Sequence, residues 1–258
     1  MNGPTNLFMI GGGWRLEAFP LTYGPFVRAA TRDSRCRIAL LIVLEPGDDP
    51  DEWIAQFRSP FESLSMTSDQ LPTFVLTRDH PLDISAVAAT KPTGIFVCGG
   101  LTPLYQELLC TDTAFRDYLF SNRLPYGGFS AGSSIAANRA VVGGWKLPDS
   151  LGGLTIVDEE VSENLDELTV RPGLGLVPFA IDVHCGTWGT LTRLINAVAH
   201  GMVESGWGID EDTMLEIHDG ALIVHGLGRA YRVNAHGTGE VIVTAFRPGD
   251  HIDLNTNR

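Results

Sequence analysis

The sequence is poor in basic residues and in cysteine, and it contains no long hydrophobic run. Its 258 residues hold 18 Lys and Arg against 31 Asp and Glu, which gives a formal net charge of -13. Nucleic-acid-binding proteins present clustered Lys and Arg to the phosphates, so this balance argues against a nucleic-acid partner. No apolar run approaches the roughly 20 residues that a helix needs to cross a bilayer, so a membrane is not an expected partner either.

The cysteines form no CxxC pair; they are Cys36, Cys98, Cys110 and Cys185. Two of them lie in apolar, strand-like runs, where a reduced cysteine packs as a small hydrophobe. The first residues lack the basic segment and apolar stretch that mark a secretory signal. We therefore expect a cytoplasmic protein. Its length suits one α/β domain over residues 1–258.

Short apolar runs alternate with longer helix-compatible segments along the chain. Strands are predicted at residues 6–10, 37–44, 73–76, 94–98 and 179–183, and helices at residues 102–120 and 190–200. This alternation is typical of a mostly parallel central sheet with helices on both faces. We therefore predict a three-layer α/β sandwich.

The pattern changes after Trp207, where short strand-like pieces follow one another. They cover residues 213–217, 221–224, 230–233 and 240–246. Asp219-Gly220 separates the first two, and Asp-Gly between such runs is a strong hairpin signal. The last quarter is therefore predicted to extend the sheet with antiparallel hairpins.

Ser130 lies in a GxSxG sequence, between a strand lead at Pro125-Tyr126 and a helix-compatible run at residues 135–139. This is the sequence form of a nucleophile elbow, in which a sharp strand-to-helix turn lifts the serine hydroxyl above a sheet. Gly128 and Gly132 leave room for the bend. Gly and Ser also form ordinary turns, so the motif alone fits both a nucleophile and a structural turn.

Three loops with unusual residues end predicted strands: residues 98–102, the turn at Ser130, and residues 182–186. In open α/β sheets, ligands bind beyond the carboxyl ends of the strands. A serine nucleophile needs an adjacent base, and His184 is the best candidate because it follows a predicted strand and precedes a helix. We expect it at the same sheet edge as Ser130.

A carboxylate must orient the histidine. Asp210, Glu211 and Asp212 directly precede a predicted strand, and the sequence pattern alone does not rank them. Asp182 competes, because alternate strand residues point the same way and it precedes His184 by two positions. It could instead support the site from behind the histidine.

Acyl transfer also needs hydrogen-bond donors aimed at the developing oxyanion. The N–H of Ala131 follows the candidate nucleophile, and Gly99 and Gly100 follow a predicted strand. Residues without a Cβ atom allow a substrate to approach closely, although the same pair also suits a tight turn.

Four stretches together resemble the serine peptidase family that contains aspartyl dipeptidase and cyanophycinase, whose fold is like that of class I glutamine amidotransferases. The stretches are residues 95–100, 128–132, 173–184 and 208–213, within residues 94–233. The resemblance implies a flavodoxin-like arrangement and a triad of Ser130, His184 and Glu211. It also implies a cofactor-free hydrolase that cleaves short peptides or isopeptide bonds, often beside an acidic residue.

The chain departs from this family where substrates bind. Cyanophycinase-like members carry arginines just after the histidine, whereas this chain has Trp188 and Thr190 and keeps only Arg193. Dipeptidase-like members follow the Gly-Gly turn with a polar residue, whereas this chain has Leu101, followed by Thr102. A substrate carboxylate is poorly bound without a bidentate guanidinium, so strict aspartyl specificity is not expected.

Leu101, Thr102, Trp188 and Arg193 are the predicted substrate-binding residues. Trp188 suggests an apolar or aromatic subsite, and packing against the following helix is an equally good interpretation. The expected partner is a small peptide-like substrate, with a homodimer as an open question.

Two other functions remain open at this point. An α/β-hydrolase-type esterase orders its triad as Ser, acid, His, which would place the acid within residues 158–167 and the base at His225 or His236. A member without catalytic activity would bind a ligand in the same cleft. The sequence shows no recognised metal-ligand spacing, so no metal is expected.

Overall fold

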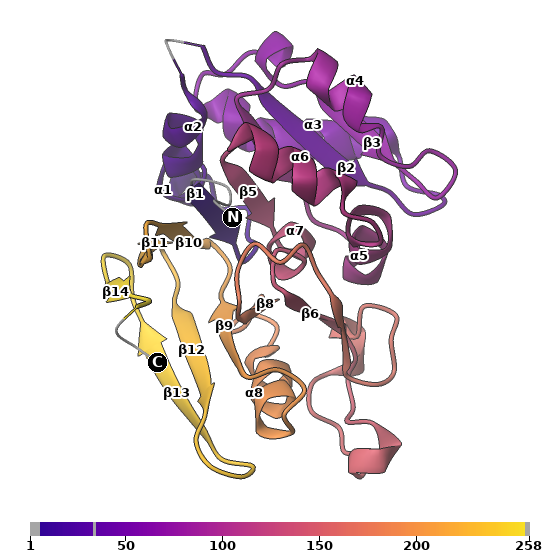
Figure 1. The fold of residues 1–258 in the computed structure, drawn as a ribbon, viewed down its shortest axis with the longest axis vertical. Coiled ribbons are helices and arrows are strands. Elements are labelled where there is room, and N and C mark those ends of the chain that lie inside the picture. Colours follow the sequence, from indigo (N-terminus) through magenta and orange to yellow (C-terminus); the bar gives the residue numbers. More distant parts are fainter. Residues whose placement is uncertain (1–5, 33–34, 256–258) are drawn as a thin grey trace.

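The central feature of the computed structural model is an eight-stranded sheet (Figure 1). The structure describes residues 6–32 and 35–255. The parallel part of the sheet runs in the order β1 (Asn6–Ile10), β5 (Tyr126–Phe129), β4 (Gly94–Val97), β2 (Ile38–Val43) and β3 (Thr73–Leu76). On the other side of β1, the sheet continues with antiparallel β10 (Thr213–His218), β11 (Ala221–Gly226) and β14 (His251–Asp253).

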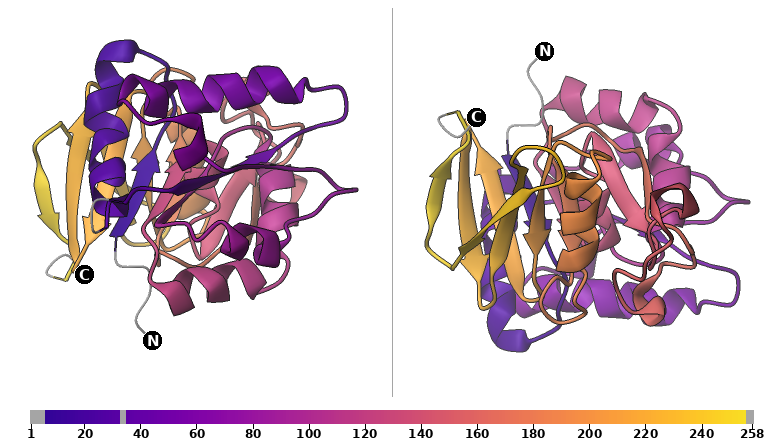
Figure 2. Two further views of the ribbon diagram at one scale, coloured as in Figure 1. Left: turned by 90° about the horizontal axis from the view of Figure 1, so that it is seen from above. Right: turned by 90° about the horizontal axis from the view of Figure 1, so that it is seen from below.

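Both faces of the parallel part are buried. Along β2, Ile38, Leu40 and Ile42 belong to one apolar cluster, and the alternate residues Ala39 and Leu41 belong to another. The first cluster packs under α1 (Phe19–Thr22), α2 (Gly24–Ala30) and α3 (Pro50–Ser63). The second packs under α4 (Ile84–Ala89), α5 (Thr102–Cys110), α6 (Ala114–Asn122) and α7 (Ala131–Ser134). The left view of Figure 2 shows the sheet between these two helical layers.

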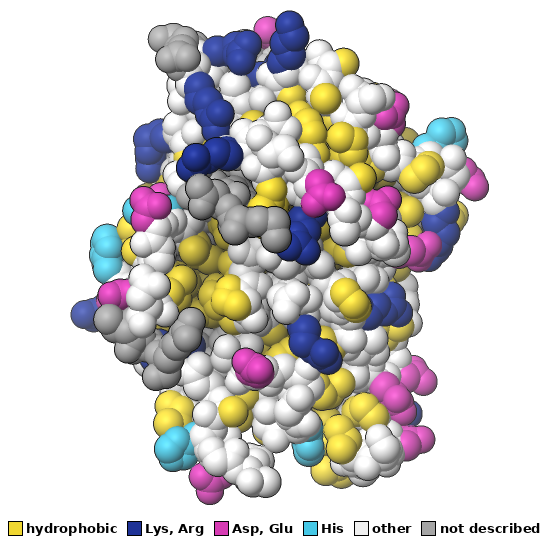
Figure 3. Space-filling view, viewed as in Figure 1, with side chains coloured by type: hydrophobic (Ala, Val, Ile, Leu, Met, Phe, Trp, Pro, Cys, Tyr) yellow, Lys and Arg dark blue, Asp and Glu magenta, His cyan; other side chains and the backbone are white. Residues whose placement is uncertain are grey.

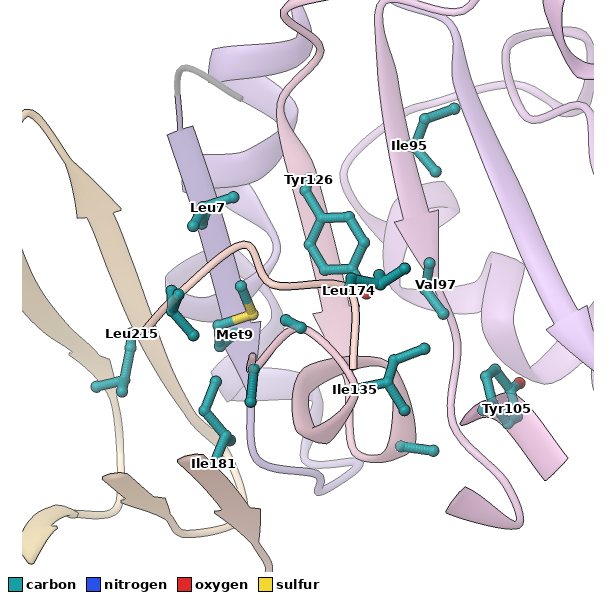
Figure 4. Packing of buried hydrophobic residues seen from close by; sticks show 14 of the residues in the cluster. Leu7, Met9, Ile95, Val97, Tyr105, Tyr126, Ile135, Leu174, Ile181 and Leu215 are labelled. Carbon is teal, nitrogen blue, oxygen red and sulfur yellow. The ribbon is translucent and has the colours of Figure 1, made fainter. Parts of the chain in front are cut away.

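A second sheet lies beside the first, with strand order β13 (Val241–Phe246), β12 (Ala230–Ala235), β9 (Ser205–Ile209) and β8 (Ala180–Val183). Helix α8 (Leu191–Ala199) packs against β8, β9 and β12. The two sheets share one core, since Ile181 of β8 and Leu215 of β10 lie in the same cluster as Met9 and Tyr126 (Figure 4).

The remaining elements are short. Strands β6 (Arg139–Gly143) and β7 (Thr169–Pro172) form a separate antiparallel pair. Single 3-10 turns occur at η1 (Leu16–Ala18), η2 (Ser68–Gln70), η3 (Asp149–Leu151) and η4 (Glu159–Val161). Across residues 6–32 and 35–255, every helix falls short of the length and apolarity that crossing a bilayer requires.

The α/β class, the mostly parallel sheet and the antiparallel strands near the end of the chain are as the sequence predicts, but strand membership differs. The predicted strand at residues 179–183 lies in the second sheet, where β8 pairs in parallel with β9. Only β10, β11 and β14 extend the central sheet, because β12 pairs with β9 instead and β13 pairs with β12.

Two predicted helices also differ from the structure. The segment 102–120 is divided into α5 and α6, because the side chain of Asp112 accepts the N–H of Ala114 and begins a new helix there. The run 135–139 is not helical. The carbonyl groups of Ile135, Ala136 and Ala137, which would continue α7, accept N–H groups from residues 174–177 instead.

Candidate active site

The carboxyl ends of four strands, β1, β5, β8 and β9, lie close together where the two sheets adjoin. The parallel register of β1 and β5 places Ile10 beside Phe129, so Gly11 and Ser130 follow their strands at the same edge. The parallel register of β8 and β9 places Val183 beside Ile209, so His184 and Asp210 are neighbours in the same way. The N–H of His184 donates to the carbonyl of Gly11 and connects the two pairs of strands.

Ser130 occupies a strained turn between β5 and α7. Its φ of 50° and ψ of -110° are unusual for a residue with a side chain, and such backbone strain is concentrated at functional sites. The flanking glycines make the turn possible. A Cβ atom at Gly128 would lie 2.6 Å from the backbone of Gly132, and one at Gly132 would lie 2.2 Å from the carbonyl oxygen of Val97.

His184 connects Ser130 with Glu211. Its Nε2 atom lies 2.8 Å from the Oγ atom of Ser130, and its Nδ1 atom lies 2.9 Å from Oε1 of Glu211. Ser130 and His184 are buried, with exposed fractions of 8% and 6%. The φ of His184 is 57°, which ends the strand alternation of β8 and turns the ring toward β5. The three side chains therefore form one continuous chain of hydrogen bonds.

The two acids beside Glu211 have other partners. Asp210 accepts the N–H groups of Gly186 and Thr187, both at 3.0 Å, and so fixes the loop after His184. Asp212 pairs with the guanidinium of Arg15, with Nε and Oδ2 2.6 Å apart. Of the three candidates that the sequence leaves unranked, only Glu211 contacts His184.

The imidazole ring of His184 is also held by Trp188 and Gly12. The indole of Trp188 stacks on it with 3.7 Å between ring centroids and 7° between planes, while remaining 44% exposed. Gly12 approaches so closely that a Cβ atom there would lie 2.2 Å from Cε1 of the ring. Trp188 therefore packs on the histidine itself rather than only on the helix that follows.

Three backbone N–H groups around Ser130 have no protein acceptor within the described residues. They belong to Gly99, Gly100 and Ala131, the three predicted oxyanion donors. The Gly99 carbonyl accepts the Tyr105 hydroxyl at 2.8 Å, and the Gly132 carbonyl accepts the Tyr126 hydroxyl at 2.7 Å. Burial raises the pKa of both phenols well above the ordinary value, so both remain protonated donors that fix these turns.

Ser130, His184 and Glu211 border a cleft of about 480 Å³. Aromatic side chains make up much of its lining: Trp14, Trp53, Phe57, Phe129 and Trp188. The charged lining residues are all acidic, namely Glu45, Glu160, Glu163 and Glu211. Gly99, Gly100 and Leu101 complete the side formed by the loop after β4.

Arg193 and Asp182 do not lie where they were predicted. Arg193 is only 3% exposed and does not line the cleft; its guanidinium forms two hydrogen bonds with Asp182, at 2.9 and 2.7 Å. Burial disfavours the charged guanidinium, but the attraction of Asp182 outweighs it and raises the pKa of Arg193. Asp182 thus pairs with α8, and the positive φ of His184 separates it from the histidine ring.

Thr102 is also absent from the cleft lining. It begins α5, and its N–H donates to Oε2 of Glu163 at 2.8 Å. Burial raises the pKa of Glu163, and this hydrogen bond offsets the rise only in part. Glu163 therefore joins the cleft wall to α5. Glu163 was not predicted for the peptidase site, and it falls in the segment 158–167 that only the esterase alternative used.

Other site residues were also missed. Trp14 and Glu45 follow the ends of β1 and β2, so their position beyond strand ends was a usable signal. Trp53 and Phe57 lie one helical turn apart on α3, which is also typical of an ordinary buried face.

The remaining candidate bases and nucleophiles have other environments. His225 contacts Glu216, with Nε2 and Oε2 2.8 Å apart, and neither His225 nor His236 lines the cleft. The triad order of an α/β-hydrolase thus has no counterpart in these contacts.

Cys185, which follows His184, is not an alternative nucleophile. Burial raises the pKa of the Cys185 thiol well above its ordinary value, so the thiol remains protonated. In the described part of the chain, no three His, Cys, Asp or Glu side chains are grouped as metal ligands.

Comparison with known proteins gives a match at the level of the fold. No family model and no curated protein matches the chain. Its structure is similar to the crystal structure of a peptidase from an acI-B1 Actinobacterium, with a TM-score of 0.69 and 13% sequence identity. The similarity covers 98% of this chain and 98% of that chain. The chain therefore shares its α/β fold with a peptidase over nearly its whole length.

Proposed function

We propose that this protein is a serine peptidase that hydrolyses small peptide-like substrates through an acyl-enzyme on Ser130. The observation that carries the proposal is the hydrogen-bond chain from Ser130 through His184 to Glu211, with 2.8 and 2.9 Å between the paired atoms. A hydroxyl, an imidazole and a carboxylate in this order activate the serine as a nucleophile.

In the first step, Nε2 of His184 takes the proton of the Ser130 hydroxyl while Oγ attacks the substrate carbonyl carbon. Glu211 accepts the Nδ1–H of His184, keeps the ring in the required tautomer, and stabilises the imidazolium that forms. The N–H groups of Gly100 and Ala131 donate to the carbonyl oxygen as it gains negative charge. Such donors act because they are already oriented when the charge develops.

The tetrahedral intermediate then collapses. The carbon–nitrogen bond breaks, and the imidazolium gives its proton to the leaving amine, which departs and leaves an ester on Ser130. A water molecule next loses a proton to His184 and attacks that ester. Protonation of Oγ by the imidazolium releases the carboxylic acid and restores the enzyme.

The shared fold with a peptidase supports a peptide bond as the target, and so does the family resemblance of the sequence. Peptide or isopeptide bonds of the dipeptidase and cyanophycinase type are the substrates that this resemblance implies. The absence of Lys and Arg among the cleft-lining side chains of the described residues argues against strict aspartyl specificity.

Substitution of the nucleophile tests the proposal. Ser130→Ala should lower kcat against a peptide panel by on the order of a millionfold and abolish labelling by a fluorophosphonate probe, because among the described residues the hydroxyl bonded to His184 is that of Ser130. Ser134→Ala is the matched control, because this buried serine lies one helical turn further along α7. Circular dichroism should show both variants folded.

Three results would contradict the proposal. If the Ser130→Ala variant were still labelled, or the Ser134→Ala variant lost labelling instead, the nucleophile would be elsewhere. If the parent protein gave no Ser130-dependent product from dipeptides, isopeptides or p-nitrophenyl esters, a ligand-binding role without catalysis would replace the peptidase.

A further inference from the structure

The charged side chains that line the cleft at Ser130 are all negative. Its lining includes four carboxylates and, within the described residues, no Lys or Arg. Two of these carboxylates already have hydrogen-bond partners: Glu211 contacts His184, and Glu163 accepts the N–H of Thr102.

The other two carboxylates are those of Glu45 and Glu160. Both are exposed, and no described Lys, Arg or His side chain forms an ion pair with either. Arg78 attracts Glu45 at longer range, but it is paired with Glu107 and does not line this cleft.

The arginines closest in sequence to the site are already paired. Arg15, next to the lining residue Trp14, is bound by Asp212, and Arg193 is buried against Asp182. On the face shown in Figure 3, Lys and Arg side chains gather over α2 and the chain that follows it. Within the described residues, no guanidinium or ammonium group in the lining can receive a substrate carboxylate.

One part of the neutral lining is an aromatic wall made of Trp14, Trp53, Phe57 and Phe129. The ring of Trp14 lies 4.8 Å from that of Phe129 and 5.3 Å from that of Phe57, and Trp53 stacks on Phe57 at 5.9 Å. Trp14 is still 39% exposed, so part of its face is open to a ligand. Aromatic faces attract cations through the ring quadrupole, and tryptophan does so most strongly.

We infer that the cleft selects a peptide-like substrate carrying an ammonium or guanidinium group, which is either a Lys or Arg side chain or a free amino terminus. The inference rests on the proposed peptidase function and specifies its substrate class. A cation there gains from the carboxylates of Glu45 and Glu160 and from the aromatic wall together. A carboxylate would meet repulsion and find no basic partner, which reverses the charge preference of an aspartyl-specific enzyme.

A substrate series tests the charge preference. Dipeptides Xaa-Ala and Ala-Xaa, with Xaa as Lys, Arg, norleucine or Asp, differ in charge while norleucine matches the lysine side chain in length. If the cleft recognises the side chain, we expect kcat/KM for the best Lys or Arg dipeptide to exceed that of its norleucine counterpart by about tenfold, the combined scale of one exposed ion pair and one cation–π contact. The Asp dipeptides should be the poorest.

Acetylation of the amino terminus separates the two sources of charge. If the side chain is recognised, acetyl-Lys peptides keep their advantage over acetyl-norleucine peptides. If the terminal amine is recognised, acetylation lowers kcat/KM for every member of the series by a similar factor. Both results support a cationic substrate, whereas indifference to both charges overturns it.

Substitutions in the cleft locate the effect. Glu45→Gln and Glu160→Gln should each lower several-fold the advantage that the recognised cation gives, measured as the Lys-to-norleucine ratio or as the ratio of free to acetylated peptide in kcat/KM, since each removes one carboxylate from the lining. Glu159→Gln is the matched control, because Glu159 precedes Glu160 in the same exposed turn but does not line the cleft. It should leave the ratio as in the parent protein.

Failure of this inference can be distinguished from failure of the peptidase proposal. Ser130-dependent hydrolysis that favours Asp peptides, or that is indifferent to both the side-chain charge and acetylation, overturns the substrate class and leaves the peptidase intact. If no peptide is hydrolysed, calorimetry on the Ser130→Ala variant with lysinamide, norleucinamide and acetyl-norleucinamide still measures the preference. Tighter binding of lysinamide than of norleucinamide supports recognition of the side chain, tighter binding of norleucinamide than of its uncharged acetyl derivative supports recognition of the terminal amine, and equal binding of all three overturns the cation selectivity.

Discussion

Gly12 illustrates how a residue outside the triad determines its geometry. The residue has a φ of 130°, and a Cβ atom there would lie 2.2 Å from Cε1 and 2.5 Å from Nδ1 of His184. Real Cβ atoms do not approach so closely, so the imidazole ring can keep its place between Ser130 and Glu211 only while position 12 has no side chain.

We therefore expect Gly12→Ala to lower kcat by about a hundredfold or more, because a shift of about 1 Å in a reacting group has that effect. Steady-state kinetics with the preferred peptide measure the change. Gly249→Ala is the control for backbone strain alone, since Gly249 has a φ of 92° and nothing within 4 Å of its Cβ position. Equal losses in the two variants would mean that strain, and not contact with His184, is responsible.

Glu163 gives the protein a pH-dependent contribution to stability. Burial raises its pKa above the ordinary value of 4.5. Between the ordinary and the raised pKa, the folded protein holds a proton that the unfolded chain has released. The contribution of this group to stability is therefore present below that window and is lost as the pH rises through it.

Glu163→Gln should consequently gain stability relative to the parent as the pH rises from about 4 to 7, because the amide stays neutral and can still accept the Thr102 N–H. Urea unfolding at a series of pH values measures the difference in the free energy of unfolding. Glu159→Gln controls for the loss of a negative charge on the same segment. A difference that is constant with pH, or that falls, would contradict the assignment.

At the scale of elements, the buried pair of Asp182 and Arg193 joins β8 to α8 directly behind the loop that carries His184. Asp182 is fully buried and Arg193 nearly so. Removing one member of such a pair leaves an uncompensated buried charge, whereas replacing both by apolar residues can be close to neutral.

Arg193→Met should therefore lower the free energy of unfolding by about 3 to 5 kcal/mol, and the double variant with Asp182→Leu should recover most of that loss. Denaturant unfolding of the two single variants and the double variant measures the coupling. If Arg193 bound substrate instead, Arg193→Met would raise KM without a comparable loss of stability.

The elements that the sequence predicted well are those whose signal is local. The unbroken apolar run of β2 indicated a strand, and the Asp219-Gly220 pair indicated the hairpin between β10 and β11. Strand pairing is not local. Nothing within residues 179–183 indicates that β8 pairs with β9 rather than with the central sheet, because that choice depends on contacts with distant segments.

The same distinction applies to the site. Strand-end loops and the GxSxG turn indicated Ser130 and His184, but the acid could not be chosen from sequence pattern alone. Asp210, Glu211 and Asp212 are consecutive, and a φ of 54° at Asp212 helps to direct their side chains to three different partners. The prediction of Arg193 as a substrate ligand failed because it lies on the buried face of α8 with Leu194 and Ala197.

At the scale of the whole molecule, the order of the candidate residues along the chain separates two ways of building a serine hydrolase. Here the residues in contact follow the order Ser130, His184, Glu211. An α/β-hydrolase places its histidine last, which would require a late residue such as His225. His225 instead lies on β11 and bonds to Glu216 on the neighbouring strand β10.

Two histidine substitutions test which order operates. His184→Asn should lower kcat by a factor close to that of Ser130→Ala, because residues of a triad act as a unit. His225→Asn should leave kcat and KM with the preferred peptide as in the parent, since its contact with Glu216 is remote from the cleft lining. Parallel kinetics on the two variants and the parent, with circular dichroism to verify folding, give the comparison. Loss of turnover in His225→Asn together with activity in His184→Asn would mean that the chemistry proceeds through the late histidine, and the hydrogen bond between Ser130 and His184 would then be structural only.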